Sequence, residues 1–381
     1  MRIALSYPDV NRRGGIERVI TECVQYLAGQ GHDLLLVASR VDPGTVPDGV
    51  RPELVKSPRA PATLSMIRFR RGAERALERA AGEFDIHAAF GSQSPGGGVL
   101  WVPSVHKAAL EALLARRGRL GRLPLVLNPD HRVRLRLEER HYRPRDYLRL
   151  IANGSTVKDD LVRHHGVPEE DIDVLPPGFQ ESAFNVARRT ELRPEARARL
   201  GLSESDRVLV FVANELERKG FGPLIEALAR LGERDVRLLV VGRVRSRPYQ
   251  ERIERLGLAG RVSFVGPSDD VSYFLAAADV FVLPTLYEPW GLVIVEALAS
   301  GLPVVTTSLA GAAEAVEPGR TGVLIDDPDD TAAIAEAIAS LLRGGADPPG
   351  VISESVAHLS WTRVLERYER ILEGMYLARA T

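Results

Sequence analysis

Cysteine is almost absent from this sequence, because Cys23 is the single one in 381 residues. A lone cysteine excludes an internal disulfide framework and fits a reducing compartment. Long apolar stretches are also missing, since no uncharged run reaches the ~18–20 residues that a membrane-spanning helix requires. The chain enters a strand at residues 2–5 without the pattern of a signal peptide. We therefore expect a cytoplasmic protein, bound at most to the cytoplasmic face of a membrane.

Several motifs of metal and nucleophile chemistry are missing too. The sequence has no His-Glu-x-x-His, no Cys-x-x-Cys and no cluster of carboxylates, so we expect no bound metal. It has no Gly-x-Ser-x-Gly and no P-loop. The histidines are few, and His87, His164 and His165 fit core or surface positions, whereas His106 follows a strand on the side of an expected cleft. These absences leave glycine, arginine and glutamate as the candidates for chemistry.

Basic residues concentrate in one segment although the net charge of the chain is only −1. Residues 106–150 carry 12 basic and 5 acidic side chains. The arginines include Arg116, Arg117, Arg119, Arg122, Arg132, Arg134, Arg136 and Arg140. Three interpretations stay open: a solvated surface, a patch for an anionic acceptor, and a patch for anionic membrane headgroups. Nucleic acid is not expected as a partner, because no aromatic interleaving or binding motif accompanies the arginines.

Strands and helices alternate along the whole chain, twice over. A Leu-Pro-Pro-Gly segment at 175–178 predicts a hinge, and a polar, arginine-rich linker leads to the next strand at 207–213. Such alternation is typical of parallel sheets with helices on both faces. The length suffices for two or three domains. The sequence therefore predicts an α/β fold with two doubly wound domains, 1–178 and 179–361.

Two glutamates eight residues apart are the most informative feature. A buried strand over 281–283 places Glu288 on the loop at its carboxyl end. Pro289 favours a helix start, so a helix over about 290–300 would contain Glu296 in an apolar setting. Loop and helix separate the two carboxylates by about 10 Å. Two acceptors at that separation, with a helix N-terminus between them, could hold two hydroxyl-bearing rings on either side of a diphosphate, which is the shape of a nucleotide-sugar.

Other polar and glycine-rich loops follow strands in the same way. Arg218 and Lys219 lie at the N-terminus of a helix expected over 219–231, where the helix dipole disfavours cations, so they form either a diphosphate clamp or a solvated pair. Gly14-Gly15 opens a helix after the first strand, and Gly266 and Gly311 follow later strands. All of these loops are expected at the carboxyl edges of their sheets, where ligands bind in open α/β folds.

These motifs together resemble one family. The residues that carry the resemblance are Glu288-x7-Glu296, Arg218-Lys219-Gly220, Leu175-Pro176-Pro177-Gly178, Gly14-Gly15 and Gly301-Leu302-Pro303-Val304-Val305. They are similar to the retaining GT-B glycosyltransferases of family 4, nearest the lipopolysaccharide core glucosyltransferase I type. The resemblance implies two Rossmann-like domains facing a cleft, with a last helix at about 362–381 crossing back to the first. It assigns acceptor binding to 1–178 and donor binding to 179–361.

The resemblance also implies roles for single residues. Glu288 would bind hydroxyls of the donor sugar, and Glu296 those of the ribose. Arg218 and Lys219 would stabilise the leaving diphosphate. The implied catalytic residues are Arg218, Lys219, Glu288 and His106, and the implied donor-binding residues are Gly14, Gly15, Val265, Gly266, Leu292 and Glu296.

The implied activity is transfer of a hexose, with retention and without a metal or cofactor. The donor would be a nucleotide-diphosphate sugar, UDP-glucose above others, and the acceptor a hydroxyl of a glycan, lipid-linked or small-molecule partner. A nucleotide-sugar epimerase and an inactive nucleotide-sugar-binding protein remain as alternatives. The chain departs from the family pattern at Trp290, where phenylalanine is commoner, and in the glycine-rich loop 91–98.

Overall fold

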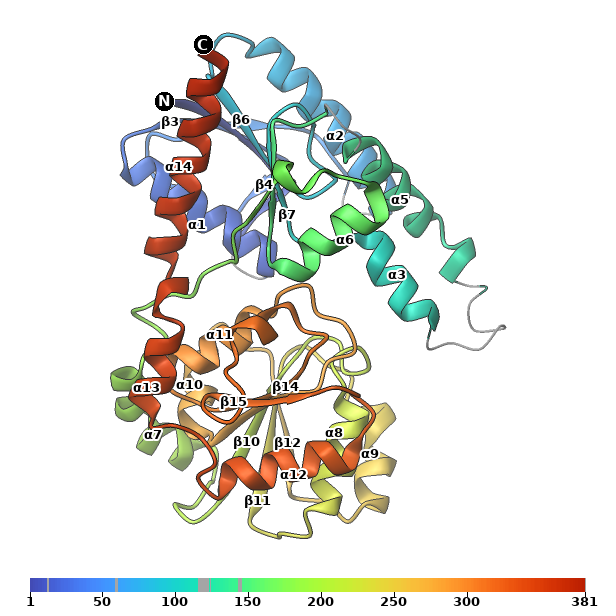
Figure 1. Ribbon diagram of the computed structural model, residues 1–381, viewed down its shortest axis with the longest axis vertical. Coiled ribbons are helices and arrows are strands. Elements are labelled where there is room, and N and C mark those ends of the chain that lie inside the picture. Colours follow the sequence, from blue (N-terminus) through green and yellow to red (C-terminus); the bar gives the residue numbers. More distant parts are fainter. Residues whose placement is uncertain (12–13, 59–60, 116–122, 124, 143–145, 381) are drawn as a thin grey trace. The chain divides into compact units, whose positions relative to one another are not determined.

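The computed structural model describes residues 1–381 except 12–13, 59–60, 116–122, 124, 143–145 and 381. The chain divides into two compact units, each with its own parallel sheet (Figure 1). The first unit contains Met1–Pro177 and Thr362–Thr381, and the second contains Gly178–Trp361. The predicted α/β fold of two doubly wound units is thereby confirmed, including the return of the last helix to the first unit. No helix within the described ranges is both long and apolar enough to cross a bilayer.

The first unit is built on a seven-stranded sheet of order β5-β3-β1-β6-β7-β8-β9. Its strands are β1 (Arg2–Ser6), β3 (Asp33–Ala38), β5 (Arg51–Leu54), β6 (Ile86–Phe90), β7 (Val99–Val102), β8 (Arg149–Ala152) and β9 (Ile172–Val174), and a small pair is formed by β2 (Asp9–Val10) and β4 (Arg40–Val41). Its helices are α1 (Gly15–Gly29), α2 (Ala62–Arg79), α3 (His106–Ala115), α5 (Pro129–His141), α6 (Ser155–His165) and α14 (Trp361–Ala380). Apolar strands such as β6 and β7 are buried along their whole length, as expected where helices cover both faces.

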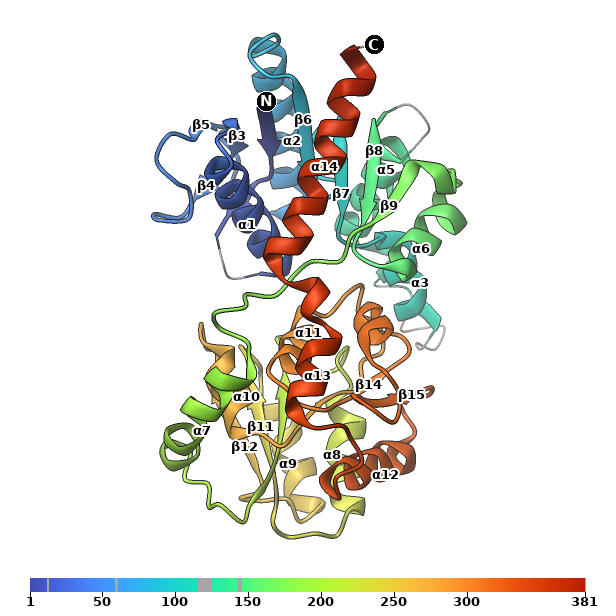
Figure 2. The same cartoon turned by 60° about the vertical axis from the view of Figure 1, so that its left-hand side comes forward.

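Helix α14 lies beside the strands of this unit (Figure 2). Its Tyr368 is fully buried and packs on Trp101, with ring centroids 5.1 Å apart, and on Phe90 at 6.4 Å. Glu369 accepts a hydrogen bond of 2.9 Å from the Tyr26 hydroxyl and lies 2.7 Å from His32 Nε2. Aromatic contacts of Tyr368 and polar contacts of Glu369 therefore hold the last helix on the first unit.

The second unit has a six-stranded parallel sheet of order β12-β11-β10-β13-β14-β15. The strands are β10 (Arg207–Val212), β11 (Val236–Val241), β12 (Val262–Gly266), β13 (Val280–Leu283), β14 (Val304–Thr307) and β15 (Gly322–Ile325). The helices are α7 (Val186–Arg199), α8 (Phe221–Arg230), α9 (Arg247–Arg255), α10 (Val271–Ala277), α11 (Leu292–Ala299), α12 (Thr331–Leu342) and α13 (Pro349–Ser355). The chain winds outward from β10 on one side and from β13 on the other, so the switch point lies between these two strands.

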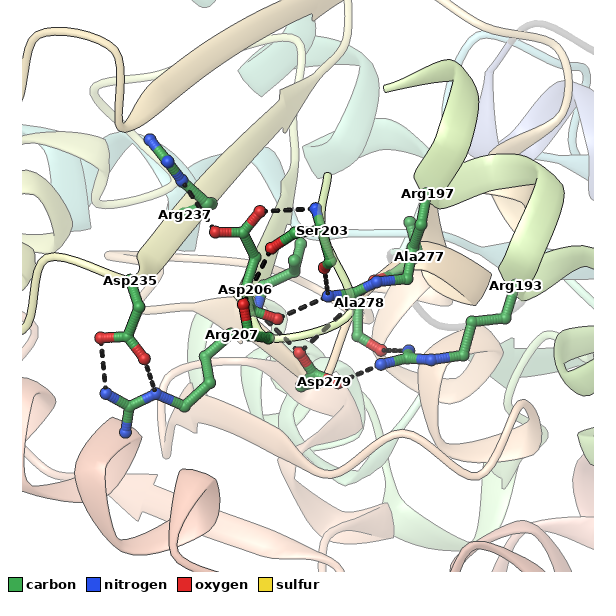
Figure 3. Close-up of polar contacts among 12 residues, drawn as sticks. Arg193, Arg197, Ser203, Asp206, Arg207, Asp235, Arg237, Ala277, Ala278 and Asp279 are labelled. Carbon is green, nitrogen blue, oxygen red and sulfur yellow. Dashed lines mark hydrogen bonds and ion pairs between the residues drawn. The ribbon is translucent and has the colours of Figure 1, made fainter. Parts of the chain in front are cut away.

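The arginine-rich segment before β10 was predicted as a linker, and that prediction is wrong for α7. Arg189, Arg193 and Arg197 share one helical face, and Arg193 and Arg197 point at the end of α10 in Figure 3. Arg193 donates to the Ala278 carbonyl over 2.8 Å, and Arg197 donates to the Ala277 carbonyl over 2.8 Å. A polar helix is stable here because its cations satisfy the unpaired carbonyls at a helix C-terminus.

Two helices begin later than the sequence pattern predicted. The helix expected from 290 begins at Leu292, after Gly291 with φ of 100°. The helix expected from 219 begins at Phe221, after Gly220 with φ of 79°. A left-handed glycine at each N-cap turns the chain sharply into the helix, so Pro289 is not the first helical residue. The polar residues thus lie on loops that precede the helices.

Candidate functional site

The loops after β10 and β13 meet at the switch point of the second sheet. The Leu286 amide donates to the Arg218 carbonyl over 2.9 Å, and the Thr285 hydroxyl donates to the same carbonyl over 3.1 Å. A Cβ on Gly220 would collide with the Pro284 carbonyl. Glycine at 220 therefore permits both the left-handed turn and the close approach of the two loops.

Three of the predicted residues come together there. Lys219 Nζ forms an ion pair with the Glu288 carboxylate, and Arg218 Nη1 lies 3.3 Å from the same Glu288 oxygen. Arg218 also donates to the Tyr287 carbonyl over 2.6 Å and pairs with Glu215 at 3.1 Å. Two cations from one loop and one carboxylate from the other form a preassembled charged cluster. In this cluster the cations could bind a diphosphate and the carboxylate could bind a sugar.

Burial changes the acidity of Lys219. The loss of solvent and the neighbouring Arg218 guanidinium lower the pKa of Lys219 to about 7, while Glu215 acts in the opposite direction. The contact with Glu288 also favours the ammonium form. Lys219 therefore exchanges between the ammonium form and the neutral amine near neutral pH, and an anion beside it favours the ammonium form.

The Glu288 loop is fixed by backbone bonds to the loop after β14. The Gly311 amide donates to the Glu288 carbonyl over 2.8 Å, and the Ala312 amide donates to the Trp290 carbonyl over 2.8 Å. A Cβ on Gly311 would collide with the Pro289 carbonyl. Trp290 is only 3% exposed and belongs to the core of this unit, so its departure from the family pattern is a packing difference.

Glu296 and Leu292 lie on α11, which starts beside this cluster. Leu292 is the first residue of the helix and is half-buried, whereas Glu296 is 1% exposed. The partly positive N-terminus of α11 follows Glu288 by four residues, which places a favourable field for an anion next to the charged cluster.

Val265 and Gly266 end β12 at the same edge of the sheet. Gly266 has φ of 82°, and its carbonyl accepts a 2.8 Å hydrogen bond from the Gly242 amide at the end of β11. A Cβ on Gly242 would collide with the Ala213 carbonyl after β10. The carboxyl ends of β10, β11 and β12 are therefore packed backbone to backbone, while the space that a Cβ on Gly266 would take is open.

Gly14 and Gly15 begin α1 in the first unit, after β1. Gly14 is the extended N-cap, and a Cβ on it would collide with the Glu17 carboxylate. Burial raises the pKa of Glu17, whose carboxylate accepts a 3.3 Å hydrogen bond from the Tyr7 hydroxyl. Glu17 was not predicted as a site residue, although an acidic residue in the first turn after Gly14-Gly15 is visible in the sequence.

His106 begins α3, where the Glu138 carboxylate accepts hydrogen bonds from the His106 and Lys107 amides, the latter over 3.1 Å. Its Nε2 lies 2.9 Å from His131 Nδ1, and the two rings stack with centroids 5.0 Å apart. Burial lowers the pKa of His106 to about 4, so its imidazole is neutral. His131 was not predicted as a site residue, because nothing in its local sequence pattern links it to His106.

Only part of the basic segment 106–150 lies within the residues that the structure describes. Arg132, Arg134, Arg136 and Arg140 lie on α5, while Arg116, Arg117, Arg119 and Arg122 lie outside the described residues. Gly14, Gly15 and His106 belong to the first unit and the other predicted site residues to the second. The structure thus joins Arg218, Lys219 and Glu288 directly, and places Val265, Gly266 and Leu292 along the same sheet edge.

Comparison with known proteins agrees with these motifs. The model described as "Glycosyltransferase Family 4" matches residues 13–182, and "Glycosyl transferases group 1" matches residues 206–344. A D-inositol 3-phosphate glycosyltransferase of Rhodococcus opacus is 35% identical over 228 residues, which are 56% of this chain and 50% of that protein. The lipopolysaccharide glucosyltransferase WaaG of Escherichia coli is 33% identical over 172 residues, 44% of this chain and 46% of that protein. The chain thus spans about half the length of the curated relatives it matches.

The fold has a close counterpart among solved structures. A crystal structure of WaaG, a glycosyltransferase involved in lipopolysaccharide biosynthesis, superposes with a TM-score of 0.82. It is 23% identical and covers 98% of this chain and 100% of that one. With the two family models and the cluster at the switch point, the resemblance inferred from the motifs is confirmed. The chain belongs to the family 4 glycosyltransferases and has their GT-B fold.

Proposed function

We propose that this protein transfers a hexose from a nucleotide-diphosphate sugar, UDP-glucose above others, to a hydroxyl of a glycan or lipid-linked acceptor. The observation that carries the proposal is the contact of Arg218 and Lys219 with Glu288 at the switch point of the second sheet. At this sheet edge, two cations complement the charge of a diphosphate, and one carboxylate can accept hydrogen bonds from the hydroxyls of the neighbouring sugar. The implied role of Glu296 at the ribose stays part of the proposal.

The cluster suggests how the donor would be held. The Glu288 carboxylate pairs with both cations. An incoming diphosphate competes for Arg218 and Lys219, which frees the Glu288 oxygens to accept hydrogen bonds from sugar hydroxyls. The same cations then offset the charge that develops on the diphosphate as it leaves.

The proposed reaction retains the configuration of the anomeric carbon. The acceptor hydroxyl attacks from the face that the diphosphate leaves, so the new carbon–oxygen bond forms as the bond to the phosphate oxygen breaks. The acceptor proton passes to the leaving phosphate. Neither Glu288 nor Glu296 is proposed as a nucleophile, because both are better placed as binders.

The acceptor is a further part of the proposal. The relatives named above are a lipopolysaccharide glucosyltransferase and a D-inositol 3-phosphate glycosyltransferase. We favour a glycan or lipid-linked acceptor, met in the cytoplasm or at the cytoplasmic face of a membrane, through the first unit. The α5 arginines are candidates for contact with such an acceptor or with anionic headgroups.

Metal independence is a separate part of the proposal. Within the described ranges, no group of three or more His, Cys, Asp or Glu side chains is arranged to hold a metal ion. We expect transfer to continue at full rate after dialysis against EDTA. A rate restored only by added divalent cations would reject this part.

A donor screen tests the proposal. Thermal shift with UDP-, GDP- and ADP-sugars should show the largest stabilisation with a UDP-hexose. The product formed from that donor should keep the anomeric configuration by NMR. Free hexose and nucleotide released without any acceptor would identify an epimerase-type enzyme, and donor binding without turnover on any acceptor would identify an inactive binding protein.

A further inference from the structure

A second charged site lies in the first unit, in a groove between the end of β5 and helix α2. Its cavity measures about 460 Å³ and none of the residues predicted for the donor lines it. Five cations line it: Lys56, Arg68, Arg71, Arg75 and Arg79. We call this cavity the α2 groove.

The floor of the α2 groove depends on a glycine in the middle of a helix. A Cβ on Gly72 would collide with the Val55 side chain just after β5. Glycine inside a helix costs about 1 kcal/mol relative to alanine. Here it allows α2 to approach the edge of the sheet closely, and the longer side chains on either side then form walls around a hollow.

The charges in the α2 groove are arranged in a row. Residues 68, 71, 75 and 79 repeat at helical spacing, so the four arginines share one face of α2. Eleven residues at the helical rise extend about 16 Å. Among the described residues, Arg79 has an ion-pair partner, Glu53 at 2.8 Å, and the structure gives none for the other four cations. Several like charges in one hollow repel one another unless an anion is bound.

The α2 groove suits a ligand in solution better than a bilayer. The apolar side of α2, including Met66, Phe69 and Ala73, is buried, so the helix has no free apolar face to insert between lipids. Leu54, which lines the groove, is 62% exposed but is a single apolar side chain. Guanidinium groups bind phosphate oxygens with two parallel hydrogen bonds.

We propose that the α2 groove binds a soluble ligand that carries two or more phosphate groups spaced along its length. This site is separate from the donor diphosphate site in the second unit and does not depend on the transfer reaction. The length of the arginine row selects an elongated polyanion over a single phosphate.

Calorimetry with tripolyphosphate tests the α2 groove. The experiment uses the full chain with Arg218→Ala and Lys219→Ala, so that the donor loop does not contribute to anion binding. We expect saturable binding that weakens at least tenfold with Arg71→Ser and Arg75→Ser. The matched control removes two exposed arginines of α14 in the same unit, with Arg363→Ser and Arg379→Ser, and should change the affinity less than twofold.

The remaining outcomes decide against the proposal. Equal loss of affinity in the groove and control variants would show unspecific attraction to positive charge. Orthophosphate that binds as tightly as tripolyphosphate would reject the elongated ligand. Binding only to vesicles of anionic phospholipid, with none to tripolyphosphate at low salt, would make the groove a membrane contact instead.

The melting temperature of each variant is the control for folding. A melting temperature equal to that of the parent would show that the variants are folded.

Discussion

Lys219 is buried between a guanidinium group and two carboxylates, and this setting gives it an unusual acidity. Burial and Arg218 lower its pKa to about 7, so part of the free protein carries a neutral amine near neutral pH. A bound diphosphate would favour the ammonium form and raise the pKa of Lys219. Donor binding should therefore take up a proton.

We expect the affinity for UDP to fall as the pH rises above 7, by about tenfold per pH unit while the bound form stays protonated. Calorimetry at pH 6.5 to 9 measures the affinity, and buffers of different ionisation enthalpy count the protons taken up. Lys219→Arg serves as the control, because its guanidinium stays charged and should flatten the profile. Equal pH dependence in both proteins would contradict the role of Lys219.

The substitution Glu296→Gln, which conserves the shape of the side chain, tests the proposed contact with the ribose. The carboxylate is 1% exposed on α11, so Glu296→Gln keeps the volume and removes the charge. We expect UDP affinity to drop by about tenfold, which corresponds to ~1.4 kcal/mol. Arg218→Ala should instead lower turnover more than donor affinity. Unchanged UDP affinity in Glu296→Gln, by calorimetry, would remove Glu296 from the ribose site.

Some site residues could be predicted from a local sequence motif, and others could not. Glu288, Arg218 and Lys219 were predictable because each follows a strand in a motif of several residues. Glu17 could have been found from the sequence, because it lies three residues after Gly14. His131 could not, because its importance lies in its contact with His106. Contacts across 25 residues leave no trace in a local pattern.

At the scale of elements, helix α7 shows how a polar segment becomes part of a core. Arg197 is buried and donates to the carbonyls of Ala277, Ser203 and Asp206 over 2.8, 2.6 and 2.5 Å. Arg193 pairs with Asp279, whose other oxygen accepts a 2.7 Å bond from the Val208 amide (Figure 3). The arginines therefore connect α7, the end of α10 and the start of β10.

Arg197→Met should destabilise the second unit by about 2–4 kcal/mol, because three carbonyls lose their charged donor. Urea unfolding of the two proteins measures the difference. Arg199→Met is the matched control on the same helix, since the Arg199 side chain is 72% exposed and pairs with Glu195 at the surface. A control that costs as much as Arg197→Met would show that helix propensity, not the carbonyl contacts, sets the effect.

At the scale of the whole molecule, α14 joins the first unit although it is the last element of the chain. Its Tyr368 fills a position against Trp101 and Phe90, and Glu369 bonds Tyr26 and His32. The stability of the first sheet therefore depends on a segment that follows the complete second unit.

Tyr368→Ala should destabilise the first unit by about 3–5 kcal/mol, the usual result of removing a buried aromatic ring. Hydrogen exchange should accelerate in peptides from β6 and β7 and stay unchanged in those from β10 and β13. Leu377→Ala, at a side chain 61% exposed on the same helix, should leave both sets unchanged. Equal acceleration in both units would mean that they unfold together.

The alternation of strands and helices, the parallel sheets and the edge at which polar loops gather could be predicted from the sequence, because these follow from local periodicity and chain connectivity. The sequence also predicted the charged loops at 218–219 and 288. Tertiary structure alone decided that Arg218, Lys219 and Glu288 share one cluster, that α7 is a helix, and that glycines 220 and 291 start their helices late. Each of these depends on contacts between segments far apart in the chain, and burial there sets the acidity of Lys219 as no local pattern could.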